Sequence, residues 1–194
     1  MNIQSPHLPR VTQAAEGLPR RRWTVAECYA LVEAGIIDEK ERFELIGGEM
    51  VPMSPKGMKH EVLKQWLNKN LTKQLPDSFD VIPETTFIFS EDTFIEPDFV
   101  VYPAGELEKL SPETCLLAIE VSVSTFRYDM GRKAALCASF GIRDYWVINA
   151  KTLETHVHRE PSEDGFQSVE ALARGEEIKP KHLDNFTLNL KEFK

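Results

Sequence analysis

The chain has 194 residues, of which 42% are hydrophobic and 28% charged, a balance typical of a globular protein. Its net charge of −8 argues against avid, nonspecific binding of nucleic acid over the whole surface. The three cysteines, Cys28, Cys115 and Cys137, form no Cys-x-x-Cys pair, which favours a reducing compartment over a disulfide framework. No apolar stretch is long enough to cross a membrane and no signal-peptide pattern is visible, so we expect a cytoplasmic protein.

The first predicted helix follows an N-terminal tail. Residues 1–20 contain prolines and little hydrophobic periodicity, which predicts a loosely packed tail before one domain over residues 21–194. Thr24 and Glu27 have the spacing of a capping box, so we predict that a helix begins there. Gly35 is the residue expected to end it.

A hairpin and a longer helix are predicted next. Two adjacent glycines at 47–48 separate two short apolar stretches, and a two-residue turn of this kind is typical of a β-hairpin. Residues 58–75 have apolar side chains at helical spacing. The apolar residues expected to be buried are Val62, Leu63, Trp66, Leu67 and Leu71. The other faces of this region are basic, with Lys56, Lys59, Lys64, Lys69 and Lys73.

Short strands dominate the rest of the chain. The predicted segments are strands at 81–89, 93–102 and 116–123, a helix capped by Asp129 and ended by Gly141, and strands at 145–148, 153–158 and 186–190. This order predicts an α/β or α+β protein with a central mixed β-sheet flanked by helices.

Two acidic residues lie in segments that are predicted to be buried. Glu120 interrupts an apolar run, and Asp98 belongs to the strand predicted before it. A buried carboxylate is costly unless a cation or hydrogen-bond donor meets it. Alternation along each strand would place Asp98 on one face with Glu96, Val100 and Tyr102, and Glu120 on one face with Ala118 and Ser122. If the two strands are neighbours in suitable register, the two carboxylates converge.

A shared cation would explain such a pair. Two carboxylates in one site repel unless one is protonated or a metal lies between them. Oxygen ligands suit Mg²⁺ (or Mn²⁺), so Asp98 and Glu120 are the expected ligands. Such an ion makes water a better nucleophile and stabilises charge on a phosphoryl oxygen. Lys133, one turn beyond Asp129, could reach the site to orient the water or to stabilise the transition state, although a lysine on a helix more often lies on a solvated face.

Several short motifs occur in a fixed order between Trp23 and Ile148. They are residues 43–51, Met53-Ser54-Pro55 with His60, Glu96-Pro97-Asp98, residues 120–125, Asp129 with Lys133, and residues 141–147. In this order the chain resembles the Uma-type family of putative restriction endonucleases, within the PD-(D/E)XK nuclease superfamily. Each motif alone is weakly specific, and their common order and spacing are more specific.

The resemblance implies a restriction-endonuclease-like core with an N-terminal helix and a β-hairpin. It implies that Asp98 and Glu120 bind the metal, with Val121 as a further metal contact. Lys133 would replace the lysine that most superfamily members carry two residues after the glutamate, where this chain has Ser122. The resemblance implies a fold more directly than a substrate.

Other residues are candidates with plain alternatives. Lys59 and Lys64 are candidate phosphate contacts, although a lysine-rich helix face is more often only solubilising. His60 and Ser122 are candidate substrate contacts, although a histidine at the start of a helix is more often incidental. Glu44 of the hairpin is an additional catalytic candidate, and a surface position is about equally expected.

The acidic pair also has structural alternatives. Asp98 could satisfy backbone donors at a strand irregularity, and Glu120 could form a structural ion pair. His156 and His158 have the spacing of metal ligands, but no third ligand is evident, which favours exposed strand positions for both.

Three functional hypotheses follow. The first is a Mg²⁺-dependent endonuclease that hydrolyses phosphodiester bonds in duplex DNA, as a homodimer if both strands are cut. The second is a catalytically inactive module of the same fold that binds nucleic acid or protein. The third is a metal-dependent hydrolase of smaller phosphoesters.

Overall fold

The structure is a computed structural model that describes residues 21–105, 107–184 and 186–194. The tail predicted at 1–20 therefore lies outside the described residues. The helices are α1 (Val25–Glu33), α2 (Met58–Gln74), α3 (Phe126–Tyr128) and α4 (Ala134–Ser139), with 3-10 turns at Leu107–Lys109 and Leu190–Glu192. The strands are β1 (Phe43–Ile46), β2 (Glu49–Pro52), β3 (Phe79–Pro83), β4 (Phe87–Ser90), β5 (Thr93–Ile95), β6 (Phe99–Pro103), β7 (Leu117–Ser122), β8 (Asp144–Asn149), β9 (Thr155–Ser162) and β10 (Gly165–Leu172).

The strands form two sheets. The larger sheet has the order β10-β9-β8-β7-β6-β3, in which β7 and β8 are parallel and the other neighbours antiparallel. This confirms the predicted mixed sheet and an α+β architecture. The smaller sheet has the order β2-β1-β5-β4, so the predicted hairpin is present and two further strands extend it.

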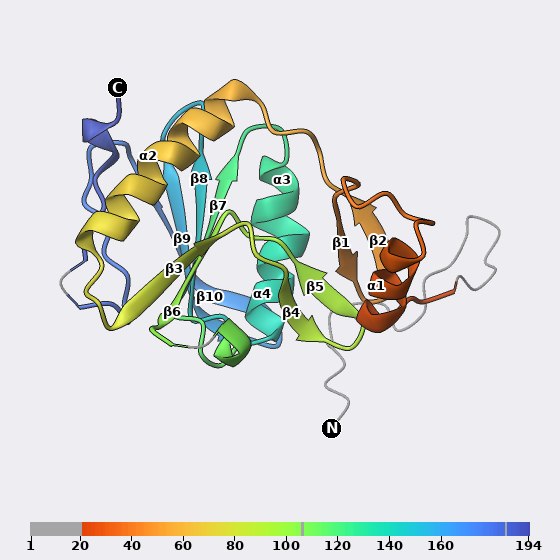
Figure 1. Ribbon diagram of the computed structural model, residues 1–194. Coiled ribbons are helices and arrows are strands. Elements are labelled where there is room, and N and C mark those ends of the chain that lie inside the picture. Colours follow the sequence, from red (N-terminus) through yellow and green to blue (C-terminus); the bar gives the residue numbers. More distant parts are fainter. Residues whose placement is uncertain (1–20, 106, 185) are drawn as a thin grey trace.

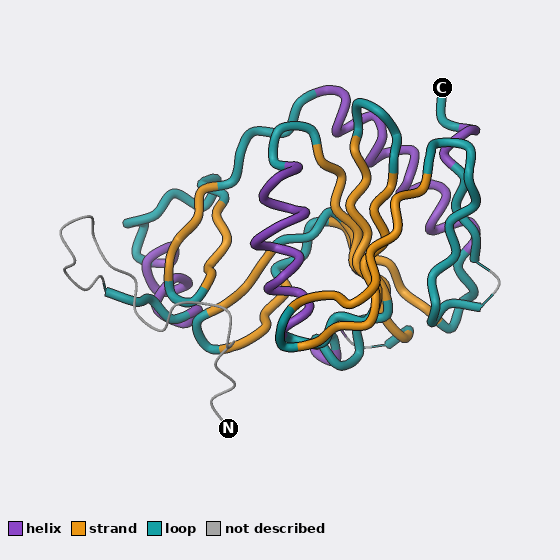
Figure 2. Tube along the Cα trace, turned by 180° about the vertical axis from the view of Figure 1, so that it is seen from behind, coloured by secondary structure: helices purple, strands orange, loops and turns teal. Residues whose placement is uncertain are grey.

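Helices cover both sheets and separate them (Figure 1). Helix α2 crosses one face of the larger sheet, and its Leu63, Leu67 and Leu71 are fully buried in the core beneath it. The segment α3–α4 lies between the two sheets, as the view from behind also shows (Figure 2). Each fully buried leucine contributes on the order of 2 kcal/mol to folding. Val62, predicted to be buried with them, is 43% exposed because it lies beside that face of α2.

Two predicted strands are each divided in two. The strand predicted at 81–89 becomes β3 and β4, which belong to different sheets and are separated by Glu84 with φ +50°. The strand predicted at 93–102 becomes β5 and β6, because Pro97 has no N–H to continue the ladder. The alternation that grouped Asp98 with Val100 therefore does not apply, since Asp98 lies in the break between the strands.

The helix that was predicted to begin with Asp129 as its N-cap begins earlier. It starts at Phe126 after Thr125, passes through a π-helical turn at Asp129–Lys133, and continues as α4 to Ser139. Gly141 follows with φ +80°, as predicted for the residue that ends it. Asp129 is thus inside the helix and buried, and so is Lys133. Turns of the π type often occur where a helix supplies functional side chains.

The C-terminal predictions are partly wrong. The strand predicted at 153–158 is found as β9, and β10, which pairs with it, was not predicted. Residues 186–190 form no strand; Leu188 makes only an isolated bridge with Ile178. His158 is buried rather than exposed, since its ring packs against Tyr145 and Phe166.

The described part of the chain contains neither a disulfide nor a helix that is long and apolar enough to span a bilayer. All three cysteines are buried. Burial raises the pKa of the Cys115 thiol to about 12 and raises that of Cys137 well above its ordinary value. Both thiols are therefore protonated and unreactive at neutral pH.

The hairpin turn contains a glycine that the fold requires. Gly48 has φ +82°, and a Cβ at this position would lie 2.5 Å from Cβ of Arg22. We expect Gly48→Ala to lower the free energy of unfolding by about 2–4 kcal/mol, because strain and overlap add. Gly35→Ala is the matched control, since its φ is +67° and nothing lies within 4 Å. Urea unfolding should show a clearly smaller loss for Gly35→Ala; equal losses would mean that the overlap with Arg22 is unimportant.

Candidate active site

A cavity of about 330 Å³ is formed where the hairpin β1–β2, the start of α2, the break between β5 and β6, the end of β7 and the π-helical turn meet. Most of these segments are far apart in the sequence and are brought together because α3–α4 packs between the two sheets. The charged residues around the cavity are Glu44, Lys56, His60, Glu96, Asp98, Glu120, Asp129 and Lys133. The sequence had already singled out Glu44, Asp98, Glu120 and Lys133 as catalytic candidates and His60 as a substrate contact.

Asp98 is held by three donors. Its Oδ2 accepts hydrogen bonds from the backbone N–H of Val121, at 2.8 Å, and from Nε2 of His60, at 3.1 Å. Its Oδ1 lies 3.0 Å from Nζ of Lys56. Burial by itself would raise the pKa of Asp98, but the hydrogen bond from His60, the charge of Lys56 and the Val121 N–H together lower the pKa to about 2. The carboxylate is therefore ionised at neutral pH.

The strand register brings Asp98 and Glu120 to the same cavity. Strands β6 and β7 are antiparallel with Phe99 opposite Ile119, so the residue before Phe99 faces the residue after Ile119. Both acids line the cavity, and the negative charge of Asp98 is one reason why the pKa of Glu120 is raised. The two side chains thus share one cavity, as expected. The argument from strand alternation does not apply to Asp98, because this residue lies before β6 and not within it.

Glu120 is buried with an excess of negative charge. Burial raises its pKa well above the ordinary value, and Asp98, Asp129 and Glu44 add to this, while Lys133 opposes it. Among the described residues, Oε1 of Glu120 has no hydrogen bond of good geometry, although Nζ of Lys133 is an ion-pair partner at 2.7 Å. This oxygen is therefore an incompletely satisfied acceptor inside the site.

Lys133 joins acids from two different sheets. Its Nζ lies 2.6 Å from Oε1 of Glu44 and 2.7 Å from Oε1 of Glu120. Burial alone would lower the pKa of Lys133, but Glu120, Glu44 and Asp129 outweigh it and raise the pKa well above the ordinary value. The ammonium is therefore charged, and three acids surround this one cation.

Glu44 fixes the position of the lysine. Its Oε1 accepts a hydrogen bond from the backbone N–H of Glu96, at 3.1 Å, and its Oε2 accepts one from the hydroxyl of Tyr128, at 2.9 Å. Burial and the adjacent Glu44 carboxylate raise the pKa of Tyr128 far above its ordinary value, so the phenol stays a donor. Tyr128 was not found from the sequence, because no local pattern connects two residues that are 84 positions apart.

The predicted substrate contacts are placed differently from one another. His60 is buried in the first turn of α2 and touches Asp98. Lys59 is exposed, and Lys64 pairs with Glu61 and Glu84; neither lines the cavity. Ser122 does not line the cavity either, and its Oγ lies 3.3 Å from Oγ1 of Thr125. Lys56, which the sequence offered only as part of a basic run, does line it.

The donor set fits a small, hard cation. Within the described ranges, no group of three or more His, Cys, Asp or Glu side chains is arranged to hold a metal ion. Mg²⁺ commonly uses only one or two protein carboxylates and keeps several waters, so Asp98 and Glu120 would suffice. The under-satisfied oxygen of Glu120 and its raised pKa both indicate a place where an added positive charge is favourable.

The family assignment comes from comparison with known proteins. Residues 26–191 match the model of the Uma2 family, which is described as putative restriction endonuclease. The chain belongs to the Uma2 family. No curated protein matches the chain.

A solved structure agrees with this Uma2 assignment at the level of fold. The crystal structure is of a protein from Anabaena variabilis that is described as a putative nuclease belonging to DUF820. The match has a TM-score of 0.65 and 17% sequence identity, and covers 87% of this chain and 96% of the other. The Uma-type resemblance and the fold expected from the motifs are therefore confirmed.

Proposed function

We propose that this Uma2 protein is a metal-dependent endonuclease that hydrolyses phosphodiester bonds in duplex DNA. One observation carries the proposal: Asp98, just before β6, and Glu120, on the neighbouring strand β7, line one cavity, with the ammonium of Lys133 2.7 Å from Glu120. Membership of a family described as putative restriction endonucleases supports nuclease activity at the family level, as does the likeness to the Anabaena protein.

The metal would be Mg²⁺ or Mn²⁺, held by the carboxylates of Asp98 and Glu120 and by the main-chain carbonyl of Val121. When bound, it would supply Lewis-acid stabilisation of the phosphoryl group and a nucleophilic water at neutral pH. The hydrogen bonds from Val121 N–H and His60 orient Asp98 and keep it ionised, which suits a ligand.

Lys133 would stabilise negative charge on the reacting phosphate. Lys133 is kept protonated by three surrounding acids, so its role is electrostatic stabilisation of developing negative charge and not proton abstraction. Glu44 holds the ammonium in place, and Tyr128 and the Glu96 N–H hold Glu44. Lys59, Lys64 and His60 stay proposed substrate contacts, whereas Ser122 is fully buried and does not line the cavity.

A binding module without chemistry is the second candidate. Lys56 already lies 3.0 Å from Asp98, and Lys133 lies 2.7 Å from Glu120, so each proposed metal ligand has a cation of the protein beside it. If these ion pairs are permanent, no metal binds. Calorimetric titration with Mn²⁺ separates the two candidates, since heat of binding that is lost in Asp98→Asn supports the enzyme.

The activity itself can be tested with a charge-balanced double variant. We expect plasmid DNA to be cleaved with Mg²⁺ or Mn²⁺ and not in EDTA. Glu44→Gln combined with Lys133→Met removes one acid and one cation, so the net charge of the site is unchanged although Glu120 loses its ion-pair partner, and cleavage should fall about 10²–10³-fold. The matched control, Glu49→Gln with Arg132→Met, removes an exposed pair that joins the same hairpin and helix at 3.3 Å. Equal cleavage by both double variants would refute a catalytic role for Lys133.

The partners are proposals of the same kind. Cleavage of both strands needs two active centres, so we propose a homodimer, which analytical ultracentrifugation with and without duplex DNA would reveal. Rates on duplex DNA should exceed those on single strands, mononucleotides and small phosphoesters. Faster turnover of a small phosphoester would favour the third hypothesis.

A further inference from the structure

A second charged cluster lies outside the proposed metal site and is centred on Glu84, between β3 and β4. Its Oε1 alone meets three cations: Lys56 in a short contact, Lys64 at 2.9 Å and Arg42 at 3.4 Å. These cations come from the segment before α2, from α2 itself and from the segment before β1. Three cations around one anionic oxygen is an arrangement that would equally suit an oxygen of a phosphate.

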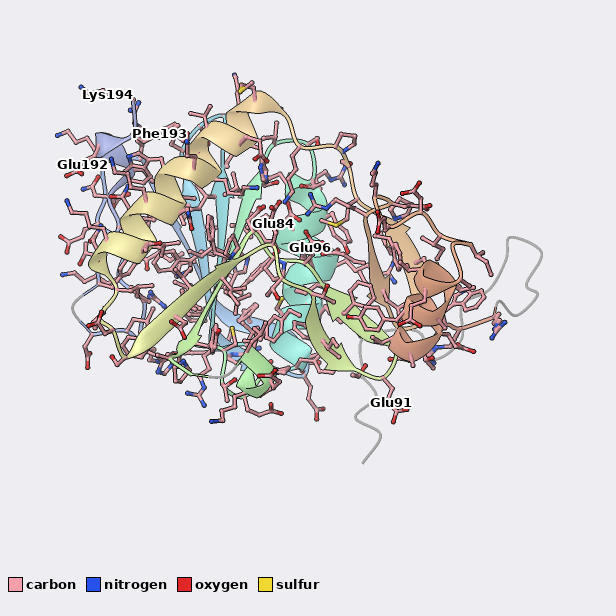
Figure 3. All side chains as sticks on the ribbon, in the orientation of Figure 1. Glu84, Glu91, Glu96, Glu192, Phe193 and Lys194 are labelled. Atoms are coloured by element: carbon pink, nitrogen blue, oxygen red, sulfur yellow. The ribbon has the colours of Figure 1, made fainter. Side chains whose placement is uncertain are left out.

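The cluster adjoins the proposed active site through Lys56. This lysine lines the first cavity and contacts Asp98 as well as Glu84. Glu84 and Lys64 line a second cavity, of about 430 Å³, that runs beside α2. Figure 3 shows Glu84 and Glu96 near each other in the middle of the molecule, and Arg42 contacts both. An extended anion could therefore lie across both cavities.

Glu84 is anionic under all ordinary conditions. Burial would raise its pKa, but the hydrogen bonds and charges of Lys56 and Lys64 lower it to about 2. Each cation also has a second acid, namely Glu96 for Arg42, Asp98 for Lys56 and Glu61 for Lys64. These second acids would therefore hold the three cations in place if the Glu84 side chain moved away.

A purely structural role explains the cluster less well. Glu84 is 32% exposed, so solvent screens its ion pairs more than those of the buried acids of the site. The residue also has φ +50°, which is unfavourable for a side chain other than glycine. The chain thus accepts backbone strain to place a carboxylate on cations that other acids could already neutralise.

We propose that Arg42, Lys56 and Lys64 form a subsite for a backbone phosphate of the nucleic acid, next to the scissile one, and that Glu84 occupies this subsite until the substrate displaces it. The inference rests on the proposed function, because it assumes a polyanionic substrate at the same cavity. A phosphate that binds Lys56 would weaken its ion pair with Asp98, and a metal that neutralises Asp98 would free Lys56 for the phosphate, so the two binding events should favour each other.

Binding to a fluorescein-labelled duplex in EDTA tests the subsite without any cleavage. Glu84→Gln should tighten the dissociation constant about tenfold at low salt, because it removes the competing charge. Glu84→Gly should do the same while relieving the positive φ, which keeps the test valid if one variant folds poorly. Asp77→Asn, an exposed site after α2, removes the same unit of charge as a control and should change little.

The cations should show the opposite effect. Lys56→Ala with Lys64→Ala should weaken binding and lower the slope of log K against log salt by about 2, as expected for two lost phosphate contacts. Lys73→Ala, an exposed lysine in the last turn of α2, should have little effect. Unchanged or weaker binding by both Glu84 variants, or equal tightening by Asp77→Asn, would overturn the proposal.

Failure of the proposed function would give a different result. If neither the wild-type protein nor any variant binds duplex DNA, and the wild type does not cleave plasmid DNA with Mg²⁺ or Mn²⁺, the endonuclease proposal fails, and the subsite is then judged with inorganic pyrophosphate. Thermal stabilisation by pyrophosphate should be larger for Glu84→Gln than for wild type and absent in the double lysine variant. Equal stabilisation of all three proteins would refute the subsite.

Discussion

Glu120→Gln is expected to make the protein more stable at pH 8 and to abolish its proposed cleavage activity. The carboxylate is buried among Asp98, Asp129 and Glu44, with Lys133 as its one close cation among the described residues. An amide of the same shape removes the repulsion. We expect the free energy of unfolding to rise by about 1–2 kcal/mol, which corresponds to roughly 2–8 °C in melting temperature. Gains of this size are common when a functional residue is replaced.

The gain should depend on pH in a defined direction. Because the pKa of Glu120 is raised in the folded state, the folded protein binds this proton more tightly than the unfolded one. Below the ordinary glutamate pKa of 4.5, Glu120 is protonated in both states, so the wild type carries no penalty from its charge. The wild type then loses stability as pH rises through the raised pKa of Glu120 in the folded state. Melting curves of the two proteins should converge near pH 4 and separate at pH 8.

Loss of activity in the same variant follows from the charge. A neutral amide is a poor ligand for a hard cation, and several kcal/mol of transition-state stabilisation would be lost, or about 10³-fold in rate. Glu170→Gln, at an exposed position on the edge strand β10, is the control and should alter neither property. A lower melting temperature for Glu120→Gln would show that the carboxylate stabilises the fold instead.

Asp98→Asn is expected to abolish cleavage and to destabilise the protein at pH 7 by about 2 kcal/mol. This loss corresponds to a pKa that the fold lowers from 3.8 to about 2, since each pKa unit is worth about 1.4 kcal/mol. The amide cannot replace the negative charge that Lys56 and His60 meet. Urea unfolding at pH 7 measures the loss, and plasmid cleavage with Mn²⁺ measures the activity.

The pH dependence of this loss has the opposite sign to that at Glu120. The stability contributed by Asp98 is fully present above the unfolded pKa of 3.8 and disappears as pH falls through the folded pKa near 2. The difference between wild type and Asp98→Asn should therefore shrink between about pH 4 and pH 2. Asp80→Asn, which also loses a carboxylate bonded to a backbone N–H, is a more exposed control. A pH-independent difference would contradict the assigned charge state.

Local sequence patterns predicted the elements whose signals are short-range. The capping box of Thr24 and Glu27, the glycine turn of the hairpin and the leucine spacing of α2 all depend on residues within a few positions of one another. The buried strand around Glu120 was also recognisable, because an apolar run of that length is covered on both faces. These predictions agree with the structure because no distant contact is needed to interpret them.

The failures arise where a distant contact decides. Period-two alternation cannot detect a break such as the one at Pro97, so Asp98 was assigned to a regular strand. Glu84 bends the chain between the two sheets, which nothing local to it indicates. Lys56 and Tyr128 become part of the site only through partners far away in the sequence, Asp98 and Glu44. Lys133 was singled out by its position one turn beyond Asp129, and only the family resemblance favoured a functional role over a solvated helix face.

The ion pair between Glu44 and Lys133 spans the boundary between the smaller sheet and the helix that packs on the larger one. If the smaller sheet detached briefly, Asp98 just before β6 and Glu120 on β7 would keep their places, but the ammonium would lose one of its two ion-pair partners. The competent state would then last only as long as that sheet stays docked. Amide hydrogen exchange in β1 and β2 would thus report an upper bound on the lifetime of the working enzyme, without any substrate present.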